Sequence, residues 1–200
     1  MARRDTLDGD VFQPLWAAGW QWQWLVVGAV FLGGYFVVEF GELLQGAAVI
    51  LGGGAIAAVG IRYVDRRFEP LLDAGIDRVE SAVLDAVDDA YADATAYTVL
   101  TADQRLAFVG PAKAYAVTTL LVGDDAFVVH DDASVSLAHR FFEVGADAHR
   151  YEYGTVSEIG YDDGELTVVS TDGSEDTYSL SREPVEALAD VRARLSAVGT

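Results

Sequence analysis

The sequence of 200 residues contains no cysteine and almost no lysine. The absence of cysteine excludes a disulfide framework, a zinc or iron–sulfur site with cysteine ligands, and a thiol nucleophile. Lys113 is the only lysine, and the other 12 basic residues are arginines that form no cluster of the kind that neutralises phosphates. Because nucleic-acid binding depends on such clusters, we expect no nucleic-acid partner.

The motifs of the common enzyme classes are also missing. There is no Gly-x-Ser-x-Gly, Walker-type loop, dinucleotide fingerprint or His-Glu-x-x-His, and the glycines at 52–54 lie inside an apolar run. The three histidines are His130, His139 and His149, and the first is followed by two aspartates. Aspartate at a strand end is typical of turns. We therefore expect no enzymatic activity, no cofactor and no metal site.

Acidic and apolar residues are both abundant, but they occupy different parts of the chain. The 32 acidic and 13 basic residues give a net charge of −19, yet 52% of the residues are hydrophobic. Residues 11–64 carry only Glu39, Glu42 and Arg62 as charged residues, whereas residues 65–200 carry 27 acidic and 10 basic ones. This division predicts a hydrophobic N-terminal module followed by an acidic body.

The acidity is dominated by aspartate, which supplies 21 of the 32 acidic residues. A surface rich in aspartate and poor in lysine resembles the surfaces of haloarchaeal proteins. Concentrated salt would screen the self-repulsion, since the Debye length is about 3 Å at 1 M. On this interpretation the charge is an adaptation to the solvent and does not indicate a ligand.

Two uncharged runs predict a transmembrane helical hairpin. Residues 16–38 would form a helix of about 34 Å and residues 43–61 one of about 28 Å, against a hydrocarbon core of about 30 Å. The four residues between them, 39–42, suffice only for a tight turn. Neither run contains a charged residue at mid-depth, which disfavours ion-coupled transport by the hairpin alone.

Basic and aromatic residues at the ends of the runs predict the orientation of the hairpin. The connecting turn has no basic residue, so the positive-inside rule places both termini in the cytoplasm. The topology-determining residues are Arg3, Arg4, Arg62, Arg66 and Arg67. The membrane-interface residues predicted from the aromatic belt are Trp16, Trp20, Trp22, Trp24, Tyr63 and Phe68.

Export signals and a soluble core fit the apolar runs less well. A cleaved signal peptide needs a shorter apolar region, and here a second run follows after four residues. A twin-arginine signal is disfavoured because acidic residues separate Arg3-Arg4 from the apolar run. A hairpin buried in a soluble core is disfavoured by the length of the uncharged run.

Small residues four positions apart in the second run indicate close helix packing. The predicted helix-packing residues are Ala48, Gly52, Gly53, Gly54, Ala57 and Ala58. They could pack against Gly33-Gly34 within the same hairpin, or they could pack against another copy of the chain. The sequence leaves both possibilities open.

Residues 65–96 show helical periodicity. Apolar residues recur at spacings of three and four from Leu72 to Ala90, and Pro70 is expected near the start of the helix, where proline is tolerated. The helix is expected to end near Ala94. It could join protomers as a short coiled coil or fold onto the following domain, and we favour the second possibility.

From Tyr97 onward the pattern predicts six or seven short antiparallel strands closed by a helix. Residues 101–104 resemble a capping box. Strands are expected at 114–122, 127–130, within 134–144, at 149–161 with a break at Gly154, at 166–170 and at 176–180. Asp162-Asp163-Gly164 and Asp172-Gly173 are hairpin turns. The closing helix is expected to begin near Ser181, with Pro184 in its first turn.

This order of elements resembles a pleckstrin-homology-like (PH-like) domain of the bacterial and GRAM type. The resemblance covers residues 97–200 and includes the run from Tyr151 to Ile159. It implies a scaffold that binds a ligand or protein, and prokaryotic members often lie beside transmembrane helices. Phosphoinositide binding is not expected on this view, because Gly123-Asp124-Asp125, taken as the loop between the first two strands, is acidic.

The sequence therefore predicts an α+β membrane protein in four parts. They are a cytoplasmic tail (1–15), the transmembrane hairpin (16–64), a juxtamembrane amphipathic helix (65–96) and the PH-like domain (97–200). The predicted function is a scaffold or sensor in the cell membrane, with the lipid bilayer and a protein partner or a second copy as its contacts. A homo-oligomeric pore and an accessory subunit of a larger membrane complex are the alternatives.

Overall fold

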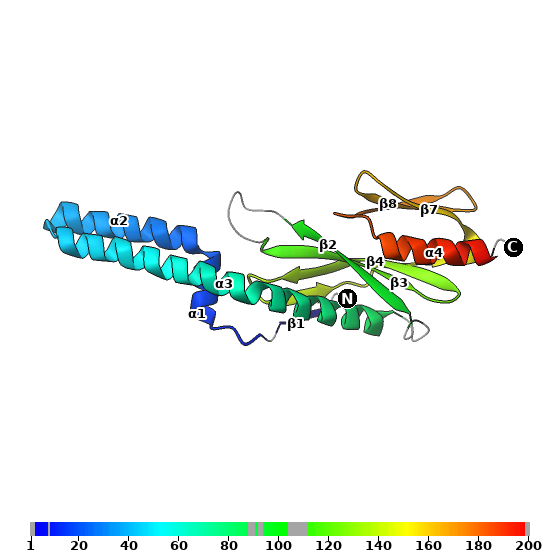
Figure 1. Ribbon diagram of the computed structural model, residues 1–200, viewed down its shortest axis with the longest axis horizontal. Helices are drawn as coiled ribbons and strands as arrows, with labels where there is room; N and C mark the ends of the chain where they lie inside the picture. The colour runs from blue at the N-terminus through cyan, green and yellow to red at the C-terminus, as the bar shows by residue number, and fades with distance from the viewer. Residues whose placement is uncertain (1–2, 8, 88–90, 92–93, 104–111, 199–200) are drawn as a thin grey trace. The chain divides into compact units, whose positions relative to one another are not determined.

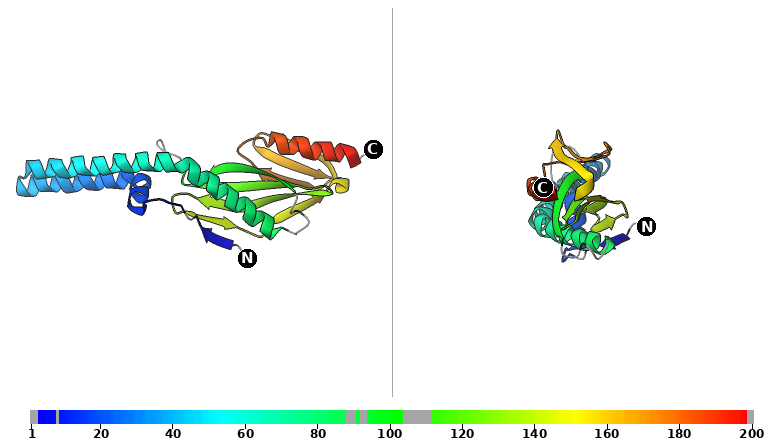
Figure 2. Two further views of the ribbon diagram at one scale, coloured as in Figure 1. Left: turned by 60° about the horizontal axis from the view of Figure 1, so that its bottom comes forward. Right: turned by 90° about the vertical axis from the view of Figure 1, so that its right-hand side faces the viewer.

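The computed structural model of the chain describes residues 3–7, 9–87, 91, 94–103 and 112–198. These residues form an α+β structure, the class predicted from the sequence, with four α-helices and two β-sheets (Figures 1 and 2). The chain divides into two compact units. We call residues 8–72 the hairpin unit, and residues 1–7 together with 73–200 the β unit.

The hairpin unit contains α1 (Gln13–Trp20), α2 (Trp22–Phe40) and the first part of α3 (Leu43–Ala86). The single helix expected over residues 16–38 is therefore wrong at its start, because the helix breaks at Gln21, whose φ of −109° and ψ of 20° are not helical. The uninterrupted apolar helix is α2, whose 19 residues correspond to about 28 Å.

A tight turn joins α2 to α3, as the sequence predicted. Gly41 adopts a φ of +68°, a left-handed conformation that glycine takes without the steric cost of a Cβ. The backbone N–H of Glu42 donates to the carbonyl oxygen of Phe36 at 3.2 Å, which satisfies one of the last carbonyls of α2. Because α2 ends at Phe40 and α3 begins at Leu43, the turn is shorter than the four residues expected.

The helices of the hairpin unit pack through small residues of α3 that are seven positions apart. A Cβ at any of these glycines would overlap an atom of the facing helix. Seven-residue spacing keeps them on one face, and Figure 1 shows α2 and α3 side by side. Gly46 lies against Gly33, Gly53 against Ala29, and Gly60 against Gly19 of α1.

The helix α3 continues without interruption into the β unit and ends at Ala86. The prediction that Pro70 lies near a helix start is wrong, since Pro70 is in the interior of α3. Proline lacks the N–H that would bond the carbonyl four residues earlier, and the boundary between the two units falls close by, after Leu72. The predicted helical positions 88–90 and 92–93 lie outside the described residues.

The larger sheet of the β unit has six strands. Its order is β1 (Arg3–Thr6), β5 (Phe141–Val144), β4 (Ala126–Ser136), β3 (Ala114–Val122) and β2 (Thr95–Asp103), and β6 (Ala148–Glu152) also pairs with β4. All the pairings are antiparallel. The strand β4 is long enough to pair with β6 through its first half and with β5 through its second.

A short 3-10 turn, η2 (Tyr153–Thr155), leads into the second sheet, which has the order β7 (Val156–Asp162), β8 (Glu165–Ser170) and β9 (Glu175–Ser179). The break predicted at Gly154 and the two predicted hairpins are confirmed. At the first hairpin Asp163 and Gly164 have φ of 46° and 87°, the left-handed values that a two-residue turn requires. The chain then ends in α4 (Val185–Val198).

The core of the β unit lies where α4 meets both sheets (Figure 1). Phe127 of β4, Leu166 of β8 and Leu188 of α4 are almost fully buried in one cluster. The last turns of α3 also pack on the larger sheet, since Gly75 contacts Val135. The second possibility left open for residues 65–96, a helix folded onto the following domain, therefore describes the C-terminal part of α3.

Three local expectations for the β unit are wrong. Residues 101–103 of the predicted capping box belong to β2 and do not open a helix, because they pair with β3 through Ala116, Tyr115 and Ala114, and Gln104 lies outside the described residues. Ser181 does not cap α4, since its hydroxyl donates to the carbonyl oxygen of Leu100 at 2.6 Å. The predicted N-terminal tail also contains β1, which pairs with β5.

Candidate functional site

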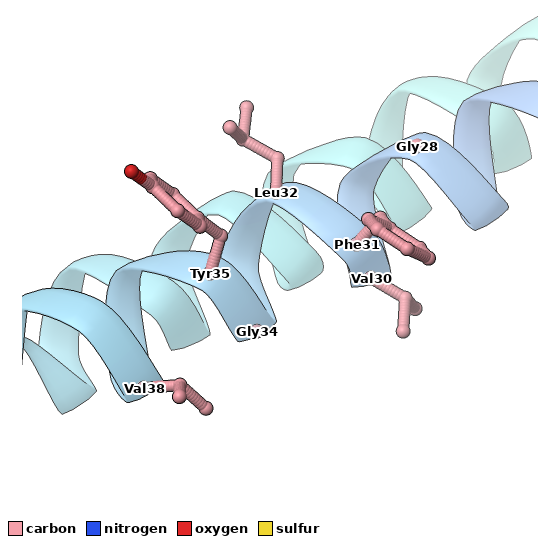
Figure 3. A pocket seen from close by; sticks show the side chains of 7 residues that line it. All are labelled: Gly28, Val30, Phe31, Leu32, Gly34, Tyr35 and Val38. Carbon is pink, nitrogen blue, oxygen red and sulfur yellow. The ribbon is translucent and has the colours of Figure 1, made fainter.

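The surface of α2 that points away from α3 is apolar and exposed. A groove of about 750 Å³ runs along it, and in Figure 3 the labelled side chains point outward from the helix. Phe31 and Val38 are 82% and 85% exposed. The lining residues are Gly28, Val30, Phe31, Leu32, Gly34, Tyr35 and Val38.

The apolar stretch of α3 is exposed as well. Leu44 and Leu51 are 86% and 73% exposed. Each of the two helices contains an apolar window long enough to cross a membrane. Only 6% of the window in α2 and 17% of the window in α3 is buried by the rest of the chain. Both helices are long and apolar enough to span a bilayer, and these apolar windows are mostly exposed, unlike the core helix of a soluble protein.

The predicted interface aromatics divide between two environments. Trp24 is 76% exposed, whereas Trp16 is buried and packs edge to face with Trp20 at 5.9 Å. The hydroxyl of Tyr63 accepts a hydrogen bond from the backbone N–H of Phe12 at 2.5 Å. Trp22 and Phe68 are half-buried. Tyr63 therefore attaches the start of α1 to α3, a role that composition alone does not reveal.

The predicted topology-determining arginines also divide into two sets. Arg62, Arg66 and Arg67 are exposed on α3, just after its apolar stretch. Arg3 and Arg4 lie in β1. Arg3 pairs with Asp85 at 3.6 Å, and Arg4 pairs with Glu143 at 3.3 Å while stacking over the ring of Phe141 at 3.8 Å. The first two arginines are thus held by the β unit.

The small residues of α3 lie on different faces of the helix. Gly53 packs on Ala29, and Ala57 is 3% exposed, so both lie in the seam inside the hairpin. The seam partner of Gly33 is Gly46, not the glycines at 52–54 that the sequence suggested. Gly52 and Gly54 have nothing within 4 Å of a built Cβ. Ala48 and Ala58 are exposed.

The β unit has a groove of about 400 Å³ beside strand β2, which is an end strand of the larger sheet. One wall is β2 itself and the other is the start of α4 with the segment that precedes it. Val185 is 63% exposed in this wall. The lining residues are Ala96, Tyr97, Thr98, Val99, Arg182, Glu183, Pro184, Val185, Glu186 and Ala187.

Two residues of β2 that line this groove donate hydrogen bonds to carboxylates. The Tyr97 hydroxyl donates to Asp190 at 3.1 Å, and the Thr98 hydroxyl donates to Glu80 at 2.5 Å. Burial, followed by Asp190 and then Glu186, raises the pKa of Tyr97 above its usual value. The sequence did not predict this groove. Its one signal was the uncharged run 95–102, which is unusual for a strand whose surroundings are solvent only.

A polar row crosses the larger sheet from Thr98. Thr98 and Thr119 are paired across β2 and β3, with hydroxyl oxygens 3.5 Å apart, and Thr119 is paired with His130 of β4. His130 is 1% exposed, and its Nε2 lies 3.3 Å from the carbonyl oxygen of Gly145. His130 is therefore packed within the sheet, and its Nδ1 is buried with no hydrogen-bond partner among the described residues.

The residues considered for metal binding are not brought together. His130 is buried, whereas the following Asp131 and Asp132 are exposed. His139 stacks near Phe141 and His149 lies edge-on to Tyr178, at 6.3 and 5.8 Å between ring centroids. Among the described residues, no group of three histidine or acidic side chains is placed to hold a metal ion.

A smaller hollow of about 240 Å³ lies at the turn between β3 and β4. Arg194 of α4 spans it, donating to the carbonyl oxygen of Gly123 at 2.7 Å and to the carboxylate of Asp124 at 2.8 Å. The hydrogen bond to Asp124 raises the pKa of Arg194. Tyr153 donates to the same carbonyl at 2.9 Å. These contacts attach α4 to the β3–β4 turn, and we therefore assign the residues of this hollow a structural role.

No family model and no curated protein matches the chain. Among solved structures, the chain is similar to the C-terminal domain of an unknown protein from Leishmania infantum. The identity is 9%, and the match covers 59% of this chain and 98% of that domain with a TM-score of 0.38.

Proposed function

We propose that the protein is a membrane-anchored scaffold or sensor whose hairpin unit crosses the membrane twice and whose β unit binds a protein partner. The observation that carries the anchor is the exposure of α2, of whose apolar window only 6% is covered by the chain. A monomeric soluble protein rarely leaves so much contiguous apolar surface in water. A bilayer supplies the missing apolar surroundings along the whole helix.

Pairing between β1 and β5 supports a hairpin with both ends on one side of the membrane. Because β1 pairs with β5, residues 3–6 share a compartment with the C-terminal strands. The chain between them must therefore cross a membrane an even number of times. Two crossings, by α2 and by the first part of α3, satisfy this condition. The exposed Arg62, Arg66 and Arg67 favour the cytoplasm for that side.

We further propose that residues 95–198 form a PH-like domain. The support is the order of elements: β2, β3, β4, β5 and β6 belong to one antiparallel sheet, β7, β8 and β9 form a second, and α4 closes the domain. With β2 included, Gly123-Asp124-Asp125 joins the second and third strands. The argument from this turn against phosphoinositide binding therefore no longer applies, and protein binding rests on the groove beside β2.

Anchoring would assist such binding, because confinement to a membrane raises the effective concentration of two proteins that share it. The many aspartates fit a salt-adapted surface, on which screening leaves short-range contacts to determine specificity. Neither argument requires catalysis, and we propose no reaction. A homo-oligomeric pore is the competing function, favoured by the outward position of Ala48, Gly52 and Ala58.

The mass of the complex extracted from native membranes in molar salt tests the proposal. We expect the chain to resist extraction by alkaline carbonate and, after detergent extraction, to migrate with at least one other protein. Release by carbonate would overturn the anchor. A homogeneous ring of identical chains would overturn the scaffold in favour of a pore, and a monomer without any partner would overturn the binding role.

A further inference from the structure

Strand β2 differs from the other edge strands of the β unit in having almost no charge. Its nine residues, Thr-Ala-Tyr-Thr-Val-Leu-Thr-Ala-Asp, include one charged residue, at the last position. Among the described residues, the other strands with a single neighbour all carry charges within their span: β1 has Arg3, Arg4 and Asp5; β6 has Arg150 and Glu152; β7 has Glu158 and Asp162; β9 has Glu175 and Asp176.

Charged residues on an edge strand prevent pairing with foreign strands, and natural proteins use them for that purpose. In a chain of which 22% of residues are charged, β2 lacks this protection, and it is rich in threonine, valine and tyrosine, which favour extended structure. The free side of β2 is therefore chemically suited to accept another strand.

The described part of the chain covers a portion of that free side. Ser181 reaches β2 with two hydrogen bonds, from its hydroxyl to the Leu100 carbonyl oxygen at 2.6 Å and from its N–H to the Thr101 hydroxyl at 3.2 Å. The segment then turns into α4, and the groove of about 400 Å³ opens beside residues 96–99. Among the described residues, the strand edge is covered at 100–101 and is uncovered beside residues 96–99, where the groove lies.

We propose that this groove binds an extended, basic peptide segment of a partner protein, which adds as a strand to β2 at Ala96–Val99. The proposal deepens the binding role proposed above and rests on it. Strand addition supplies backbone hydrogen bonds from either chain and lets alternate side chains reach the walls of the groove. Four residues of open edge correspond to about 13 Å of extended chain.

The charges around the groove determine which side chains the peptide should carry. Glu183 and Glu186 are exposed in its wall, and Asp190 and Glu80 hold the hydroxyl groups of Tyr97 and Thr98. Arg182 is the one basic residue among those that line the groove. An arginine or lysine of the peptide beside Glu183 or Glu186 would form a charge-assisted hydrogen bond. The exposed side chain of Val185 offers an apolar contact between them.

Fluorescence anisotropy with the full chain in lipid nanodiscs tests the proposal. The probe is a capped, fluorescein-labelled peptide of about eight alternating valines and arginines, long enough to span the open edge. A second peptide has glutamate in place of arginine. Two more carry N-methyl groups on the valines only or on the arginines only. In an added strand every second backbone N–H points toward β2 and pairs with it. N-methylation of the N–H groups that point toward β2 should abolish binding, and N-methylation of those that point away should not.

We expect the valine–arginine peptide to bind, the glutamate peptide to bind at least about tenfold more weakly, and only one N-methyl peptide to lose binding. Glu183→Lys with Glu186→Lys should weaken binding of the arginine peptide by about tenfold or more. The matched control, Glu158→Lys with Glu165→Lys, changes two exposed acids of the second sheet by the same charge and should leave affinity within about twofold.

Equal affinity for the arginine and glutamate peptides would overturn the basic preference. Equal effects of the two N-methyl patterns, or binding that the control pair weakens as much as the groove pair, would overturn strand addition at β2. Dimerisation of the chain that the peptide does not disrupt would assign the edge to a second copy instead. Absence of peptide binding by a chain that stays in the membrane with a partner would overturn the groove and leave the proposed function intact.

Discussion

Gly33 and Gly46 each occupy the space that a Cβ on the other would need. A Cβ built on either glycine overlaps the carbonyl oxygen of its partner, so α2 and α3 approach at backbone distance. Gly34, next in the chain, has nothing within 4 Å of its built Cβ. One glycine of the pair 33–34 therefore serves packing and the other lies on the open surface.

Gly46→Val should separate the two helices and lower the free energy of unfolding of the hairpin by about 1–3 kcal/mol, as overpacking commonly does. Unfolding in mixed detergent micelles, followed by circular dichroism, measures the change. Gly34→Val is the matched control and should cost less than about 1 kcal/mol. Equal losses in the two variants would show that the seam is not where the structure puts it.

The faces of α3 predict how self-association should respond to substitution. Gly53→Leu should destabilise the hairpin itself, because Gly53 packs on Ala29. Gly54→Leu and Ala58→Leu should leave the hairpin stable to within about 0.5 kcal/mol, because nothing lies near Gly54 and Ala58 is exposed. Any interface between copies on this outward face would lose affinity in these two variants. Sedimentation in detergent separates the two effects.

Arg194 predicts a contribution of α4 to the stability of the β3–β4 turn. Arg194→Leu removes donors to Gly123 and Asp124 and should lower the free energy of unfolding by about 1–2 kcal/mol. Urea unfolding of the solubilised chain in molar salt measures the loss. Arg182→Leu removes an exposed arginine before the same helix and should change stability by less than about 0.5 kcal/mol. A loss as large in Arg182→Leu would contradict the assignment.

Buried tyrosines predict alkaline unfolding of the β unit. Burial raises the pKa of Tyr153 and of Tyr178 from 10 to about 12, and it raises that of Tyr151, which donates to Asp176 at 2.8 Å and shares a hydrogen bond with Tyr178. The folded state therefore holds these protons more tightly than the unfolded state does. The resulting stability is fully present below pH 10 and is lost as the pH rises through about 12.

Between pH 10 and about pH 12, each of these buried tyrosines should lower the free energy of unfolding by about 1.4 kcal/mol per pH unit. Denaturant unfolding of the solubilised chain at pH 9 to 12 measures the slope. Tyr178→Phe should make the slope shallower while changing stability at pH 8 by about 1 kcal/mol. A slope identical to that of the parent chain would contradict the role of this tyrosine.

Local sequence signals predicted much of the β unit correctly. The strand at 114–122 matches β3 at both ends, because β-branched residues fill it and Gly123 stops it. The Asp163-Gly164 turn was predictable since few residues tolerate positive φ. In both cases the determining chemistry lies within a few neighbouring residues.

Long-range contacts decided the elements that were missed. Arg3-Arg4-Asp5-Thr6 has no strand pattern, and it is extended because it pairs with β5 far along the chain. The groove beside β2 exists because residues 181–187 return to a strand they follow by about eighty positions. The helix break at Gln21 was hidden, because tryptophans on both sides of it continue the apolar run.

The placement of the ends of the chain and of the α2–α3 turn on opposite sides of a membrane is the central claim. The absence of cysteine allows a direct test with single cysteines introduced at exposed positions, Asp5→Cys in β1, Glu42→Cys in the turn and Glu175→Cys in β9. Intact cells are treated with a membrane-impermeant maleimide, and opened cells serve as the reference. We expect labelling of Glu42→Cys alone in intact cells, and of all three after opening. Protection of Glu42→Cys, or different accessibility of Asp5→Cys and Glu175→Cys, would contradict the two-span hairpin.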